Sequence, residues 1–187
     1  MISASRRPRD VSSAMSDAAV LALIAEGDLG ALGVLYDRYA AVLLRFARRV
    51  AGAQDATDIV QSAFLRVVVL ARGYDVSVAS ARPWLYGIVV KIVSEHRRSV
   101  RRWTSALSRL ASQPGRTPPT IPESRADLEA CLARLSLAKR TVVILAEIEG
   151  FTSEEIAAML SIPIGTVWTR LHHARRDLRR LYMGDEA

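Results

Sequence analysis

The chain has 187 residues, 50% of them hydrophobic and only 6% aromatic, and its formal net charge is +7. This length suits one ordinary domain or two small ones and excludes a large multidomain enzyme. The basic excess predicts a polyanionic partner such as nucleic acid, although a bias toward arginine also follows from a GC-rich genome.

Cysteine and histidine are scarce, because Cys131 is the single cysteine and there are 3 histidines. This excludes an intramolecular disulfide framework and a multi-thiolate zinc site, and it disfavours a histidine-rich one, so we expect no metal and no cofactor. A free thiol suits a reducing cytoplasm. The apolar runs fall far short of the roughly 18 residues needed to span a bilayer, so we expect no membrane insertion.

The chain is predicted to begin with an arm followed by two helices. Residues 1–16 are rich in Ser and Arg and lack apolar periodicity, which favours a disordered arm. Asp17 is expected to cap a short helix that ends at Gly27. A longer helix, from about Asp28 to Gly52, carries apolar residues at spacings of three and four along one stripe.

A third helix, which we expect Asp55 to cap, has two distinct faces. Its apolar face is expected to be buried and consists of Ile59, Val60, Ala63, Phe64 and Val67. The other face groups residues at spacings i, i+3, i+4 and i+7, namely Asp58, Gln61, Ser62 and Leu65. From the residues alone, this face suits either a solvated surface with one stray leucine or a docking surface for a partner helix.

A loop is predicted from Gly73 to Arg82, and Pro83 favours the first turn of the helix that follows. That helix begins with an apolar side and ends in a basic run followed by Trp103. The run contains Arg97, Arg98, Arg101 and Arg102. Cations beside an aromatic ring suit a phosphate backbone and an unstacked base, although a basic helix end is also typical of a solvated surface.

Residues 111–122 contain four prolines among Ser, Gln, Gly and Thr. Proline disfavours both helix and strand, so we expect a flexible linker between a first helical domain, residues 17–110, and a second, residues 123–183. In the second domain Cys131 is expected to be a small core residue rather than a redox thiol. Ser136 is expected to cap the next helix.

The stretch from Thr152 to Leu181 predicts a helix-turn-helix, so that the chain as a whole is all-α with two small domains. Thr152 and Glu155 suit a capping box, and Pro163 separates the short helix from a longer one. The face of the longer helix opposite its apolar stripe consists of Thr166, Trp168, Thr169, Arg170, His172, His173, Arg175 and Arg176. Such a polar, Arg-rich second helix is typical of DNA-binding helix-turn-helix domains, although two helices with a similar turn also occur in proteins that bind no DNA.

With these motifs in this order, residues 17 to 182 resemble an extracytoplasmic-function (ECF, group IV) sigma factor, a sigma-70 family subunit of bacterial RNA polymerase. The run around Asp55, Asp58, Gln61 and Phe64 is similar to region 2.2 of that family, which grips the β′ coiled-coil. The resemblance therefore implies a core-polymerase docking surface made of Asp55, Asp58, Gln61, Ser62 and Leu65.

Residues 82–88 resemble the start of the region 2.4 helix, and the loop before them falls where the family captures an unstacked base of the −10 element. The resemblance implies −10 contacts from Tyr74, Asp75, Arg82, Trp84, Lys91, Arg97, Arg98, Arg101 and Arg102. The second domain resembles region 4, which implies that the polar face of its last helix, Thr166 to Arg176, binds the −35 element.

Several positions depart from the family pattern and leave the promoter sequence open. Ala81 stands where Phe is usual, Lys91 where many members have Asn, and Val68 or Val69 where many have Trp. Trp168 and His173 stand where basic residues are common.

The resemblance implies a protein that binds core RNA polymerase, through its β′ coiled-coil and β flap, and directs promoter-specific initiation in the cytoplasm. It also implies control by an anti-sigma factor that covers the same surfaces. The alternative is a helix-turn-helix regulator that binds an operator without polymerase. We do not expect an enzyme, because no nucleophile–base pair or glycine-rich phosphate loop is present, and carboxylates such as Glu147, Glu149, Glu154 and Glu155 suit helix surfaces and caps.

Overall fold

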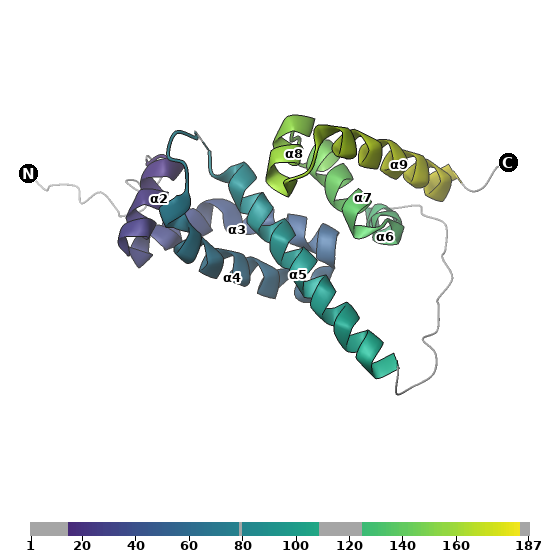
Figure 1. The fold of residues 1–187 in the computed structure, drawn as a ribbon, viewed down its shortest axis with the longest axis horizontal. Helices are drawn as coiled ribbons and strands as arrows, with labels where there is room; N and C mark the ends of the chain where they lie inside the picture. The colour runs from purple at the N-terminus through teal and green to yellow at the C-terminus, as the bar shows by residue number, and fades with distance from the viewer. Residues whose placement is uncertain (1–14, 79, 109–124, 184–187) are drawn as a thin grey trace, which may run out of the picture.

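A computed structural model describes residues 15–78, 80–108 and 125–183, and all regular structure in these ranges is helical (Figure 1). The first domain contains α2 (Asp17–Glu26), α3 (Leu29–Ala51), α4 (Ala53–Leu70), the 3₁₀ turn η1 (Ala71–Gly73) and α5 (Arg82–Ser108). The second contains α6 (Arg125–Arg134), α7 (Leu137–Val143), η2 (Ile144–Ile148), α8 (Ser153–Leu160) and α9 (Ile164–Met183). The all-α prediction is confirmed. The predicted linker, residues 111–122, lies outside the described ranges.

The first domain is built around the packing of α3, α4 and α5. The predicted stripe of α3 supplies buried side chains such as Leu35, Leu43 and Phe46, and the predicted apolar face of α4 is buried throughout. The ring of Phe46 lies 4.8 Å from that of Tyr86 on α5, so that the aromatic residues fill the centre of the domain.

Two predicted helix caps are wrong. Ser16, placed in the N-terminal arm by its composition, is the N-cap of α2 and accepts a hydrogen bond from the Ala19 amide at 3.2 Å. Asp17 is instead the first helical residue, and its carboxylate turns into the domain. Asp55 lies in the first turn of α4, because Gly52, with a φ of 109°, ends α3 and leads directly into α4 at Ala53.

The second domain begins with α6 and α7, and Ser136 caps α7 as predicted. After α7 the chain continues as a π-helical turn, η2, in which the Glu149 amide donates to the Ile144 carbonyl at 3.0 Å. The wider turn shifts the following side chains around the axis relative to an α-helix. Ile148 is left 38% exposed, and Glu149 faces the first domain.

The helix-turn-helix consists of α8 and α9. The Thr152 side chain accepts from the Glu155 amide and the Glu155 carboxylate accepts from the Thr152 amide, so the predicted capping box is confirmed. Ser161, in the left-handed region with a φ of 52°, ends α8, and Pro163 precedes α9. Val167, Leu171 and Ala174 of the predicted α9 stripe are buried against the rest of the domain.

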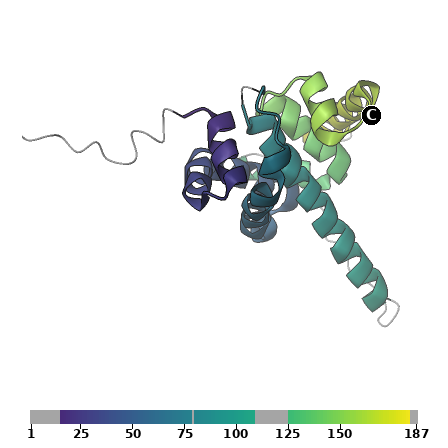
Figure 2. The same ribbon diagram turned by 60° about the vertical axis from the view of Figure 1, so that its left-hand side comes forward.

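The two domains pack against each other, which the sequence did not predict. Helix α8 contacts α5, and α6, α7 and η2 contact α3. Buried residues of both domains form a single hydrophobic cluster. Figure 2 shows that the C-terminal half of α5 extends away from all the other helices, whereas its N-terminal half lies between the other first-domain helices and the second domain.

Candidate nucleic-acid interface

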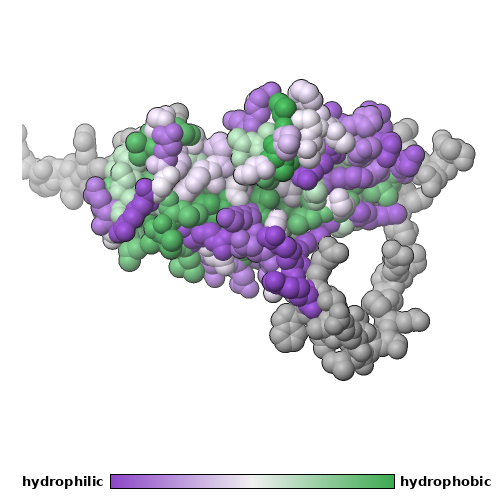
Figure 3. All heavy atoms as spheres, in the orientation of Figure 1, coloured by the Kyte–Doolittle hydropathy of each residue, from purple (hydrophilic) through white to green (hydrophobic). Residues whose placement is uncertain are grey.

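The outer face of α4 is exposed as the sequence predicts. Asp58, Gln61, Ser62 and Leu65 all lie at the surface, with Leu65 70% exposed. Val69, one turn beyond Leu65 and 76% exposed, extends this face, so that polar and apolar side chains share it. Figure 3 shows an apolar area on the side of the molecule where α4 runs toward α2. Such a mixed face fits a partner helix better than solvent alone.

Asp55 is separated from the other predicted docking residues. Its carboxylate lies 3.4 Å from His96 Nε2 of α5, and both side chains are partly exposed. Since Asp55 is in the first turn of α4, its charge also lies favourably at the positive end of the helix dipole. In the structure, Asp55 therefore connects α4 to α5 through His96.

The loop between η1 and α5 is shaped by its own side chains. The Tyr74 hydroxyl donates to the Val78 carbonyl at 3.3 Å, and the Tyr74 ring packs on Trp84 at 5.1 Å. The Asp75 carboxylate accepts from the Ser77 hydroxyl at 2.7 Å and from the Ser77 amide at 2.9 Å, and these bonds hold the pKa of Asp75 below its ordinary value. Tyr74, at 9% exposure, is thus more a part of the loop's framework than an open contact surface.

A groove of about 630 Å³ lies beside this loop and has one wall from each domain. The first-domain wall includes Tyr74, Asp75, Val78, Trp84 and Lys91. The second-domain wall is α8, through Glu155, Ala158, Met159 and the following Ser161. Four of the predicted −10 residues, Tyr74, Asp75, Trp84 and Lys91, therefore gather at this groove, and α8 covers part of it.

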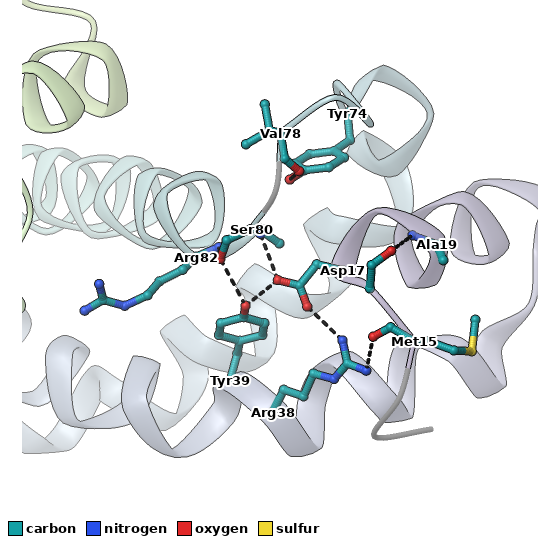
Figure 4. Close-up of polar contacts among 11 residues, drawn as sticks. Met15, Asp17, Ala19, Arg38, Tyr39, Tyr74, Val78, Ser80 and Arg82 are labelled. Atoms are coloured by element: carbon teal, nitrogen blue, oxygen red, sulfur yellow. Dashed lines mark hydrogen bonds and ion pairs between the residues drawn. The ribbon is translucent and has the colours of Figure 1, made fainter. Parts of the chain in front are cut away.

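Arg82 lies apart from the other predicted −10 residues. Figure 4 shows its side chain pointing away from Tyr74 and the loop. Its guanidinium donates to the Glu149 carbonyl at 2.6 Å and lies 4.2 Å from the centre of the Phe151 ring. In this arrangement Arg82 binds the second domain.

The basic half of α5 provides a cationic surface. Arg98 and Arg102 are exposed, and Arg97 is half-buried. Lys91 is also exposed but lies in the N-terminal half of α5, beside the groove. The side chains of Arg101 and Trp103 lie outside the described part of the chain. Because this half of α5 protrudes (Figure 2), a phosphate backbone can approach it without meeting the second domain.

The predicted −35 face lies on α9 and is exposed along its length. Trp168 is 57% exposed, and Thr169, His172, Arg175 and Arg176 are also exposed. Thr166, Arg170 and His173 are half-buried. A shallow hollow of about 600 Å³ runs along this face and includes Arg179, which the sequence prediction missed. Arg179 stands one turn beyond Arg175 and Arg176, and extending the i, i+3, i+4 pattern would have found it.

Arg175 and Thr169, both predicted DNA contacts, donate hydrogen bonds within the domain. The Arg175 guanidinium donates to the Glu147 carboxylate at 2.5 Å and 3.0 Å, and the Thr169 hydroxyl donates to the Gly165 carbonyl at 2.8 Å. The face still carries several arginines, which suit phosphate contacts, and the large ring of Trp168, which suits contact with a thymine methyl group.

An apolar pocket of about 460 Å³ lies on the second domain and was not predicted. Leu128 and Cys131 of α6, Ile148 of η2, and Leu178 and Tyr182 of α9 contribute to its lining. Leu128 is 50% and Tyr182 70% exposed, so the apolar surface is open to solvent.

Glu149 joins the two domains, contrary to the prediction of a helix-surface role. Its side chain is 11% exposed and accepts from the Tyr86 hydroxyl at 2.6 Å. Arg49 lies 3.5 Å and Arg82 3.6 Å from the same carboxylate. Burial, and then the hydrogen bond to Glu149, raise the pKa of Tyr86 far above its ordinary value, so the phenol stays a donor.

Arg140, which is 5% exposed, forms a second connection between the domains. Its guanidinium donates to the Val50 carbonyl at the end of α3 at 3.1 Å. It also donates to the carbonyls of Ala133 and Leu135 within its own domain. A buried cation thus meets one carbonyl at the negative end of α3 and two carbonyls at the end of α6.

These features define a class of protein, an all-α, two-domain DNA-binding protein whose second domain is a helix-turn-helix. The chain matches the sequence family Sigma-70 region 2 over residues 35–104 and Sigma-70, region 4 over residues 125–178. It is 32% identical over 160 residues to the ECF RNA polymerase sigma factor SigL of Mycobacterium tuberculosis, covering 83% of this chain and 90% of SigL.

Two solved structures share the fold. CnrH, in complex with the cytosolic domain of CnrY, superposes with a TM-score of 0.66 at 25% identity, over 91% of this chain and 99% of CnrH. RpoE of Bartonella quintana, in complex with the anti-sigma factor NepR, superposes with a TM-score of 0.62 at 23% identity, over 78% and 92%. The chain belongs to the ECF sigma factors of the sigma-70 family. It is therefore a promoter-specificity subunit, in a family that regulates transcription. Within the described residues, no helix combines the length and apolar character needed to cross a membrane.

Proposed function

We propose that this ECF sigma factor docks on core RNA polymerase through the outer face of α4 and binds promoter DNA through α5, the loop of residues 74–81 and α9. The observation that carries the proposal is the presence of two separate basic helices, α5 and α9, together with an exposed mixed face on α4 that carries Asp58, Gln61, Ser62 and Leu65. The protein does no bond chemistry itself and acts where the polymerase acts, in the cytoplasm.

The two DNA contacts have different tasks. The groove beside Tyr74, Trp84 and Lys91 takes an unstacked base of the −10 element, and the arginines of α5 bind the adjacent phosphates. The exposed face of α9, with Trp168 and Arg176, binds the −35 duplex. Neither small domain needs to bind tightly alone, because a shared polymerase makes the second contact intramolecular.

The arrangement of the domains bears on when DNA can bind. Met159 of α8 lies in the groove, and a Cβ atom added at Gly87 of α5 would lie 3.2 Å from Met159 Cγ. The proposed −10 groove therefore opens fully to a DNA strand only when α8 leaves α5. Arg82, now bound to Glu149, becomes available for phosphate in the same step.

We also propose a protein partner of the anti-sigma type. CnrH, which shares this fold, is bound to the cytosolic domain of CnrY. In this chain the exposed α4 face and the apolar pocket beside Leu128 and Tyr182 offer the surfaces that such a partner would cover. The same pocket supplies the apolar area expected for contact with the β flap.

Run-off transcription with core RNA polymerase and a pool of genomic promoter fragments tests the proposal. Added protein is expected to give promoter-specific transcripts that core alone does not produce. Binding of core without any specific transcript would overturn the proposal. Binding to a palindromic operator in the absence of polymerase would instead favour the operator-binding regulator.

A docking variant tests the assignment of the α4 face. Asp58→Arg with Gln61→Ala is expected to weaken core binding at least about tenfold, because it reverses one charge and removes one amide from the face. Glu26→Arg is a matched control, since Glu26 is an exposed acidic residue on α2 outside this face. Equal core affinity of the two variants, measured by fluorescence anisotropy, would contradict the docking assignment.

A further inference from the structure

Asp17, at the start of α2, is a buried carboxylate outside every surface described above. It is 8% exposed, and donors from α3 and from the end of the 74–81 loop surround it (Figure 4). Arg38 donates to Oδ1 at 2.8 Å. The Tyr39 hydroxyl and the Ala81 amide both donate to Oδ2, the amide at 2.9 Å.

These contacts fix the place where the loop becomes α5. The Ala81 carbonyl accepts from the Leu85 amide at 2.9 Å and so begins the helix, while its amide is held by Asp17. The neighbouring Ser80 hydroxyl accepts from the Arg82 amide at 3.2 Å and lies 3.5 Å from the Tyr39 hydroxyl. The loop end, through Ser80 and Tyr39, and the start of α5, through Ala81, are thus both connected to the Asp17 carboxylate.

The carboxylate is suited to hold this junction at neutral pH. Burial alone would raise the pKa of Asp17, but hydrogen bonds from Tyr39, Ala81 and Arg38 together lower it below its ordinary value. Asp17 is therefore ionised, and charge-assisted hydrogen bonds are stronger and shorter than neutral ones.

The same loop forms a wall of the proposed −10 groove. Val78 and Tyr74 line the groove and are joined by a hydrogen bond. The Tyr74 ring packs on Trp84, and this contact anchors one end of the loop to α5. The other end is anchored by Asp17 through Ala81. Releasing that end removes the hydrogen bond that ties the end of the loop to α2, so the wall of the groove can move relative to α5.

We propose that Asp17 is a positioning residue for base recognition: through the Ala81 amide and the Tyr39 hydroxyl it holds the 74–81 loop against α5, and thereby sets which unstacked base the groove accepts. The inference rests on the proposed function of that groove. Because Asp17 is buried, it acts only through the loop.

The test measures base preference rather than overall activity. The probe is a promoter fragment that the holoenzyme transcribes, prepared as a fork junction whose single-stranded non-template −10 nucleotides are randomised. Holoenzyme assembled from core polymerase and the full chain selects from this pool, and sequencing gives the enrichment of each base at each position. Asp17→Ala and the milder Tyr39→Phe are compared with wild type, after circular dichroism confirms that each variant is folded.

Two further variants separate positioning from stability. Ser16→Ala removes the cap of α2 without touching the loop, so it is the matched control. The double variant Asp17→Asn with Arg38→Met keeps an oxygen that can accept from Ala81 and Tyr39 while removing the ion pair.

We expect Asp17→Ala to lower the preference for the favoured base at one position of the single strand by about fivefold, as the loss of one hydrogen bond to the loop implies. Tyr39→Phe should lower it less, whereas Ser16→Ala and the double variant should both keep it. A uniform loss of binding with unchanged base preference in Asp17→Ala would overturn the inference. A wild-type holoenzyme with no base preference in the single strand would instead overturn the proposed groove function, and the inference with it.

Discussion

Replacing Glu149 with alanine tests whether the packing of the two domains depends on this one carboxylate. All of its side-chain partners, Tyr86, Arg82 and Arg49, belong to the first domain. The substitution therefore removes contacts between domains while leaving the helix-turn-helix with its own hydrogen bonds.

The structure allows the magnitude to be worked out. The hydrogen bond from the buried Tyr86 hydroxyl to a charged acceptor contributes about 1.5–3 kcal/mol, and its loss leaves a buried donor without a partner. The contacts with Arg49 and Arg82 are longer, at 3.5 and 3.6 Å, and the Arg82 side chain is 37% exposed. Solvent screening weakens the Arg82 contact, and the Arg49 contact is at the limit of hydrogen-bond length, so we assign each less than about 1 kcal/mol. A total of about 3 kcal/mol would shift the equilibrium between packed and separated domains by about 100-fold.

Single-molecule energy transfer measures that equilibrium directly. Dyes at Glu26→Cys on α2 and Arg180→Cys on α9, in a Cys131→Ala background, report the separation of the domains from opposite ends of the molecule (Figure 1). Glu149→Ala should move the population toward low transfer efficiency with unchanged helical content. Glu147→Ala is the matched control, because Glu147 pairs with Arg175 inside the second domain and both side chains are about half exposed.

The reasoning would be refuted if Glu149→Ala and Glu147→Ala gave the same transfer distribution and the same thermal unfolding midpoint. In that case the apolar contacts of α8 with α5, such as Met159 with Gly87, would hold the domains together without the carboxylate.

Three single side chains, two buried and one exposed, give further predictions. Burial alone would raise the pKa of Asp17, but its hydrogen bonds lower this pKa below the ordinary value of 3.8. The ionised carboxylate therefore stabilises the fold fully above pH 3.8, and this stabilisation is lost as the pH falls through the folded-state pKa. The free energy of unfolding, from urea titrations between pH 2.5 and 7, should therefore fall more steeply in acid for the wild type than for Asp17→Asn, and parallel curves would contradict this. Arg140→Lys should cost about 2–4 kcal/mol in the same measurement at pH 7, because one ammonium cannot reach the carbonyls that the guanidinium binds; a loss below about 0.5 kcal/mol would count against it. Trp168→Ala should change the free energy of unfolding by less than about 0.5 kcal/mol, since the ring is 57% exposed, yet weaken holoenzyme binding to a transcribed promoter fragment about tenfold in a gel-shift assay.

Packing of the domains bears on regulation as well as stability. The proposed function requires two DNA-binding surfaces at one promoter, and in this arrangement α8 partly covers the proposed −10 groove. A contact of a few kcal/mol is strong enough to keep the domains together and weak enough for polymerase binding to reverse. The variants at Glu149 would show how much of that balance one residue carries.

Local elements could be predicted because their causes lie within a few residues. The capping box of Thr152 and Glu155, the end of α3 at Gly52 and the start of α5 beside Pro83 each depend on neighbours in the chain. The exposed face of α9 follows from helical spacing alone. The cap predicted at Asp55 was wrong because Gly52, with its positive φ, allows α4 to begin at Ala53, before the residue whose side chain was expected to cap it.

The sequence by itself determined the helices, their apolar faces and the two basic surfaces, because periodicity and capping are short-range. Only the tertiary structure decided the roles of Glu149, Arg140 and Asp17. Their partners lie far along the chain, 63 positions away for Tyr86 and Glu149, 90 for Arg140 and Val50, and 64 for Asp17 and Ala81. A charged residue at a helix end is ordinarily solvated, and no spacing rule shows that a distant part of the chain will bury it. That burial turns Glu149 and Arg140 into contacts that join the two domains, and Asp17 into a contact that holds the loop beside the proposed −10 groove.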